Sequence, residues 1–187
     1  MSAYSIALFL HIVGALGFFA ALGLEWITVM QLKRATTAEQ VRNWLEASGS
    51  LGRVAMISMV VLLLAGIYMM ATVWGGVAWL IVAFVAIVLM MVVMGRISTP
   101  RLKVIRQAVT TEKGALSPKL QEALRHPLLW IGIQARIIMG LGVVFLMTVK
   151  PDLVGSLLTV GITIIVSLVL ALPMLNRNLV TTSRKTT

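Results

Sequence analysis

Long apolar runs, separated by short polar segments, account for most of this chain of 187 residues. A helix crosses about 30 Å of hydrocarbon with roughly 20 residues, because each residue advances it by about 1.5 Å. Runs close to that length predict membrane-spanning helices at residues 4–30, 54–74, 77–94, 127–149 and 155–174. The pattern therefore predicts an all-α, polytopic membrane bundle of five transmembrane helices, with residues 1–187 forming a single transmembrane domain.

The connections between these runs differ in length. Only Gly75 and Gly76 separate the second run from the third, and a short stretch around Pro151 separates the fourth from the fifth. Such short connections with turn-forming residues predict two tight antiparallel hairpins. The longer connections, residues 31–53 and 95–126, are the predicted cytoplasmic loops.

Positive charge is concentrated in these two loops. The chain has sixteen Lys and Arg residues but only six Asp and Glu residues. All the basic residues except Arg136 and Lys150 lie in the loops or after the last run. The positive-inside rule then places the N-terminus outside the cell and the C-terminus in the cytoplasm. Because the basic residues follow the membrane edges without a nucleic-acid-binding motif, we expect anionic lipid headgroups as partners and no nucleic acid. The sequence does not decide whether the chain forms a homo-oligomer or belongs to a larger membrane complex.

Both loops show helical patterns that predict short helices at the membrane surface. Thr36 and Glu39 have the spacing of a capping box, and the apolar positions that follow them stop before Gly49. In the second loop Pro100 and Pro118 stand where new helices are expected to begin. These loops either set the topology as solvated segments or form a docking surface.

The composition leaves few side chains for catalysis, since 59% of the residues are hydrophobic and only 12% are charged. The chain has no cysteine, which excludes disulfides, thiolate metal sites and a cysteine nucleophile. It also lacks the motifs of a phosphate loop, a metalloprotease helix and a nucleophile elbow. We predict no catalytic residues and interpret the protein as non-enzymatic.

Two charged residues lie deep within apolar runs. Arg136 is about 13 Å in from Pro127, and Glu25 is about 10 Å in from Leu32, at about 1.5 Å per residue. An Arg at the centre of a membrane helix costs roughly 2.5–3.5 kcal/mol on insertion scales, so it needs a partner or a function. We therefore predict that the first and fourth helices touch through Glu25 and Arg136. The pair is either a structural ion bridge or a proton or anion site.

Gly132 and Gly140 flank Arg136 at four-residue spacing, which places all three on one face of the fourth helix. Small residues at this spacing let a neighbouring backbone approach closely in membranes. We include both glycines in the predicted site.

His11 belongs to a seven-residue series on the first helix with Tyr4, Phe18 and Glu25. Seven residues are close to two helical turns, so the four share a face that we expect to turn inward. His11 is either a hydrogen-bonded packing residue or an axial haem ligand. His126 is expected at the cytoplasmic edge, too far from His11 for both to ligate one iron.

The segment Leu8 to Gly23, LFLHIVGALGFFAALG, resembles the opening helix of small bacterial membrane proteins of the copper-resistance-D and protoporphyrinogen-oxidase type. The segment Ile137 to Pro151, ending in FLMTVKP, is similar to small integral membrane proteins of bacteria. The first resemblance implies a haem-binding bundle of four or five helices in which His11 ligates haem b.

Three hypotheses follow from the sequence. In the first, the protein is a binding or transport-type component with an intramembrane site at Glu25 and Arg136 and no cofactor, with His11 lining the outward half of the path. In the second, it is a redox or haem-binding membrane protein that uses His11 as axial ligand. In the third, it is a structural subunit of a larger membrane complex.

Overall fold

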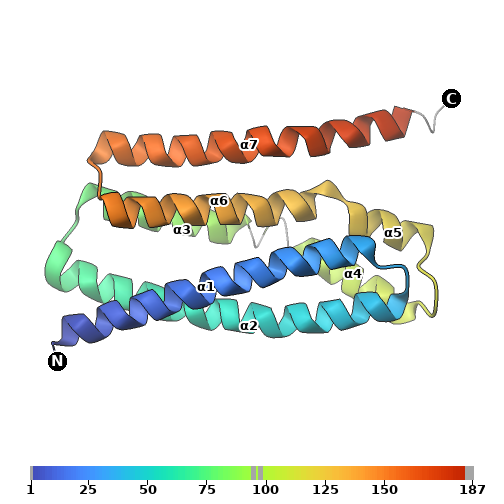
Figure 1. The fold of residues 1–187 in the computed structure, drawn as a ribbon, viewed down its shortest axis with the longest axis horizontal. Helices are drawn as coiled ribbons and strands as arrows, with labels where there is room; N and C mark the ends of the chain where they lie inside the picture. Colours follow the sequence, from blue (N-terminus) through green and yellow to red (C-terminus); the bar gives the residue numbers. More distant parts are fainter. Residues whose placement is uncertain (1, 94–95, 97–98, 184–187) are drawn as a thin grey trace.

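The protein is built from helices that lie nearly parallel along one long axis (Figure 1). The computed structural model describes residues 2–93, 96 and 99–183. Within these residues the only β-type pairing is a single isolated bridge between Thr37 and Ala115. The helices are α1 (Ala3–Arg34), α2 (Ala38–Met69) continued by a π-helical turn η1 (Met70–Trp74), α3 (Ala78–Val93), α4 (Thr99–Thr111), α5 (Pro118–Arg125), α6 (Pro127–Val149) and α7 (Leu153–Ser183).

In the part of the chain that the structure describes, four helical segments are long and apolar enough to cross a membrane, which makes this a multi-pass membrane protein. They are Ala3–Arg34, Ala38–Trp74, Pro118–Val149 and Leu153–Pro173. The predicted run 77–94 forms α3, a shorter apolar helix of 16 residues, and its last residue lies outside the described part of the chain. Within the described residues four of the five predicted spans have full length, and the described part of α3 measures about 24 Å at about 1.5 Å per residue.

The α1–α2 pair forms the most extensive helix contact in the fold, and its two members run antiparallel (Figure 1). Glycines on α1 bring the two backbones together. A methyl group on Gly14 would lie 2.8 Å from the Leu62 nitrogen and 2.9 Å from the Ser58 oxygen of α2. Because only a hydrogen fits there, the pair packs at the short interaxial distance that small residues allow in membranes.

One of the two predicted hairpins is confirmed only in part. The chain turns at Gly75, where φ is +63°, and α3 runs back antiparallel to α2, but it packs against α6 and α7 (Figure 1). Side chains of α2 and α3, among them Leu63 and Ile87, line a common cavity between the two helices. The second hairpin is confirmed, since α6 and α7 pack together across a turn at Lys150.

The segments predicted as surface loops form a compact cap over one end of the bundle. Its core is formed by the end of α1, the start of α2, the helices α4 and α5, and the start of α6. Leu32, Val41, Ile105, Leu120 and Leu124 are each at most 2% exposed. The apolar stripe of the first loop therefore packs against protein and not against lipid headgroups.

The start of α2 corrects two predictions about the first loop. The expected short helix ending before Gly49 is the first part of α2, which continues without a break to Met69 because no proline interrupts it. The cap residue is Thr37, whose hydroxyl accepts from the Gln40 nitrogen at 3.3 Å, so the box begins one residue later than predicted. The Gln40 side chain accepts from the Thr36 nitrogen at 2.9 Å.

Backbone hydrogen bonds join the two former loops. Ala38 donates to the Gly114 carbonyl at 2.9 Å, and Leu116 donates to the Thr36 carbonyl at 3.3 Å. Gly114 has a φ of +79°, a conformation that glycine adopts readily. The predicted starts near Pro100 and at Pro118 are confirmed by α4 and α5. The cap is thus a fixed structure that positions side chains at one end of the bundle.

Candidate functional site

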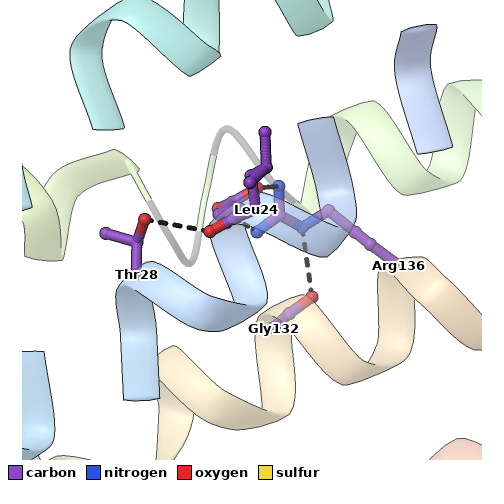
Figure 2. Close-up of polar contacts among 5 residues, drawn as sticks. Leu24, Thr28, Gly132 and Arg136 are labelled. Atoms are coloured by element: carbon purple, nitrogen blue, oxygen red, sulfur yellow. Dashed lines mark hydrogen bonds and ion pairs between the residues drawn. The ribbon is translucent and has the colours of Figure 1, made fainter. Parts of the chain in front are cut away.

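Arg136 and Glu25 meet between α6 and α1, as the sequence predicted for these two helices. The guanidinium donates from Nη1 to Glu25 Oε2 at 2.8 Å and from Nη2 to Glu25 Oε1 at 2.5 Å. Figure 2 shows the Arg136 side chain and its additional bond from Nε to the Gly132 carbonyl, which measures 3.2 Å. Two parallel bonds between a guanidinium and a carboxylate form the strongest common ion-pair geometry.

The two members of the pair differ in exposure. The Arg136 side chain is 4% exposed, whereas that of Glu25 is 23% exposed. Thr28, one turn further along α1, is also buried, but its hydroxyl donates to the Leu24 carbonyl of its own helix at 2.9 Å (Figure 2). The open side of the pair is therefore the carboxylate side, which faces a cavity.

The two glycines predicted beside Arg136 act differently from the prediction. Gly132 contributes its carbonyl oxygen to Arg136. A methyl group on Gly140 would meet the Phe19 ring at 3.2 Å, so Gly140 makes room for an aromatic side chain of α1. The close approach of a neighbouring backbone is seen instead at Gly14, because the tightest helix pair is α1 with α2.

The ion pair lines a cavity of about 280 Å³, here called the arginine cavity. Arg53 of α2 and Arg106 of α4 line it together with Glu25 and Arg136. Three guanidinium groups and one carboxylate give the lining a positive excess. Arg106 is held in place by donation from Nη2 to the Leu45 carbonyl at 3.2 Å, whereas Arg53 makes no hydrogen bond or ion pair within the described residues.

The sequence analysis assigned Arg53 and Arg106 only to the loops and missed their place in the site. For Arg106 a signal existed, because it follows Leu102 by four residues and precedes Val109 by three. It therefore lies beside the apolar face of α4 that packs into the cap, at a position that is exposed. For Arg53 the sequence offers no such signal, since its role depends on how α2 and α4 meet.

His11 lines a second cavity of about 380 Å³, here called the His11 cavity, between α1, α2, α3 and α6. The imidazole Nδ1 lies 2.9 Å from the Leu62 carbonyl, and because a carbonyl oxygen only accepts, Nδ1 carries the proton. The ring packs over Gly66, where a methyl group would lie 3.2 Å from its Cε1 atom. This bond leaves Nε2 of the neutral ring as a lone-pair donor.

The inward face of α1 is confirmed as predicted. Tyr4, His11 and Phe18 line the His11 cavity, and Phe18 and Glu25 line the arginine cavity. Phe18, Met59 and Met90 line both, so these three side chains form the boundary between the two spaces. The two cavities thus follow one face of α1 along the bundle.

The His11 cavity ends at a cluster of aromatic rings around a lysine. The Lys150 ammonium lies 4.1 Å from the centre of the Trp74 ring and 5.9 Å from that of Trp79. The two rings contact each other edge to face at 5.7 Å. These cation–π contacts join the turn after η1 to the turn between α6 and α7.

Comparisons with known proteins found no relative of this chain. No protein-family model matches the chain, and no curated protein or solved structure matches it. Functional conclusions therefore rest on the site itself.

Proposed function

We propose that the chain crosses a bacterial cytoplasmic membrane five times, with its N-terminus outside and its C-terminus inside. The direction of the helices supports five crossings, with the shorter α3 as the third, because α1 begins and α7 ends at opposite ends of the long axis (Figure 1). The cap carries basic residues of both former loops, including Arg42, Arg101, Lys103 and Lys119, and the positive-inside rule places that end in the cytoplasm. The His11 cavity then lies in the outward half of the bundle.

The protein in this proposal is a binding or transport-type component that holds an anionic group in the arginine cavity. The observation that carries the proposal is the convergence of Arg53, Arg106 and Arg136 on one cavity that contains a single carboxylate, Glu25. A guanidinium group binds carboxylate and phosphate oxygens in a planar fork. Arg53 and Arg106 would bind the anion, and Glu25 would balance Arg136 while the site is empty.

The burial of the ion pair strengthens this argument. The Arg136 side chain is 4% exposed and that of Glu25 is 23% exposed, so their charges act more strongly than they would at an exposed surface. Arg53 and Arg106 are exposed and can be reached by a ligand from outside the bundle. Arg136 is already satisfied by Glu25 and Gly132, whereas Arg53 makes no hydrogen bond or ion pair within the described residues and is free for a ligand. An incoming anion adds a negative charge where the lining has an excess of positive charge.

Inorganic phosphate binding tests the proposal in nanodiscs of zwitterionic phosphatidylcholine. We expect calorimetric titration to show that Arg53→Gln and Arg106→Gln each weaken phosphate binding by roughly tenfold, the effect of losing one charge-assisted hydrogen bond. Arg34→Gln is the matched control, because Arg34 is an exposed residue at the end of α1 that does not line the cavity. Absence of binding to the unchanged protein, or equal affinity in all three variants, contradicts the proposal.

A second candidate function is haem binding through His11, and one observation favours it. Histidines that ligate a metal almost always donate their other ring N–H to a carbonyl or carboxylate, as His11 donates to Leu62. The apolar cavity around the ring also contains Met59 and Met90, and thioethers serve as axial ligands in some haem proteins. The bound haem would supply one-electron chemistry, while the protein would hold it through His11.

An absorbance spectrum of gently purified protein tests this candidate. If His11 ligates haem, we expect a Soret band that disappears in His11→Ala. The band persists in His126→Ala, since His126 caps α6 and lies in neither cavity. A colourless preparation without bound iron excludes haem binding. The phosphate titration is independent of this outcome.

A further inference from the structure

We infer that the natural ligand is a single-chain anionic amphiphile, with its headgroup in the arginine cavity and its hydrocarbon chain in the His11 cavity. This inference rests on the proposed function, because it names the class of anion that the arginines hold. It adds a second subsite that the proposed function does not require. The chemistry is that of a long-chain carboxylate or phosphate.

The two cavities differ in chemistry as the two ends of an amphiphile do. The arginine cavity is lined by three guanidinium groups and one carboxylate. The His11 cavity is the larger one, and most of its lining is aliphatic, aromatic or thioether side chains, with His11, Thr148 and Lys150 as polar exceptions. An inorganic anion would use the first cavity and leave the second without a role.

The cavities are also adjacent. Phe18, Met59 and Met90 contribute to both linings, so a molecule that displaces these side chains would reach both spaces. Two of the three are methionines, whose unbranched side chains change rotamer easily and suit adaptable apolar contacts. A flexible hydrocarbon chain would fit between them once these side chains change rotamer.

Lys150 sits at the far end of the His11 cavity, but its surroundings argue against a second anion site there. Its ammonium group is already engaged by the rings of Trp74 and Trp79. The charged end of the ligand is therefore expected beside Arg53 and Arg106, and the end of the chain near α3.

Photolabelling with dodecyl phosphate that carries a diazirine at the end of its chain tests this orientation in phosphatidylcholine nanodiscs. We expect adducts on Leu8 and Leu63, which line the His11 cavity, to exceed those on their chain neighbours Phe9 and Leu64. Phe9 and Leu64 are 64% and 65% exposed and line neither cavity, so they report labelling from the bilayer. Equal labelling within each pair overturns the inference.

Two pairs of variants identify what holds the probe. Arg106→Gln is expected to reduce labelling of Leu63 by roughly tenfold, with Arg34→Gln as control. Ala15→Phe fills the His11 cavity and is expected to abolish the labelling, whereas Ala20→Phe on the exposed side of α1 leaves it unchanged. Dodecanol with the same diazirine tests the need for charge, and labelling of Leu63 by dodecanol as strongly as by the phosphate overturns the inference.

Competition experiments identify the source of the anion, and two further outcomes show which of the two proposals fails. If unlabelled dodecyl phosphate displaces the probe and a two-chain phosphatidylglycerol does not, the ligand is a free amphiphile and the inference is supported. If only phosphatidylglycerol displaces the probe, the ligand is a bilayer lipid and the single-chain assignment is overturned. If inorganic phosphate binds while Ala15→Phe leaves probe labelling intact, only the inference fails. If inorganic phosphate does not bind, the proposed function fails.

Discussion

Replacement of Arg136 by leucine is expected to lower the free energy of unfolding by about 3 kcal/mol, the lower end of the range for breaking a buried ion pair. Arg136→Leu leaves the Glu25 carboxylate without its two hydrogen bonds in the interior of the bundle. The estimate is at the lower end because the Glu25 side chain keeps 23% exposure towards the arginine cavity. Denaturation of the purified protein in mixed micelles measures the change.

The double variant Glu25→Leu with Arg136→Leu is the matched control. Replacing both partners with apolar residues of similar size removes the charge together with its counter-charge, and such replacements are often neutral. We therefore expect the double variant to recover to within about 1 kcal/mol of the unchanged protein. An Arg136→Leu variant as stable as the unchanged protein contradicts the role of the pair.

The same double variant separates the structural role of the pair from its functional role. If the pair only sets the contact of α1 with α6, the folded double variant binds inorganic phosphate normally. If Arg136 contributes to the field of the arginine cavity, the folded double variant binds phosphate more weakly. The calorimetric titration proposed above distinguishes these results.

Replacement of Gly14 by alanine is expected to destabilise the protein by about 1–3 kcal/mol, the usual range for overpacking. The new methyl group would lie 2.8 Å from a backbone nitrogen and 2.9 Å from a backbone oxygen of α2. Neither atom can move without its helix, so α1 and α2 would have to separate. Because His11 bonds to Leu62 of α2, the separation would also weaken that bond. Unfolding in mixed micelles measures the loss.

Gly23→Ala provides the control on the same helix. A methyl group at Gly23 meets nothing within 4 Å, and alanine is favoured over glycine in helices by about 1 kcal/mol in water. We expect this variant to be at least as stable as the unchanged protein. Equal destabilisation by Gly14→Ala and Gly23→Ala would show that the close α1–α2 contact is absent.

The contact between Glu25 and Arg136 could be predicted from the sequence because both charges are costly in a membrane and lie at similar depths. The inward face of α1 could also be predicted, since its seven-residue spacing is a property of the helix alone. Which residues complete the site could not be predicted in this way. Arg53 and Arg106 come from segments whose helical patterns are clear, but their convergence depends on the packing of the cap.

The packing of α2 shows the same limit. Its apolar stripe around Val41 is visible in the sequence, but an apolar stripe fits lipid headgroups and a protein core equally well. Only the presence of α4 and α5 above it places Val41 in a core, at 0% exposure. In the same way Gly75 and Gly76 indicate a turn without determining which helix α3 contacts after it.

The sequence by itself determined the helices, their apolar character and the need of Arg136 for a partner, because each follows from the transfer free energy and periodicity of neighbouring residues. Only the tertiary structure decided the divergence of α3 from α2, the cap, and the two cavities that meet at Phe18. These features depend on how side chains distant in the sequence fill space together. No local pattern in the chain encodes that choice.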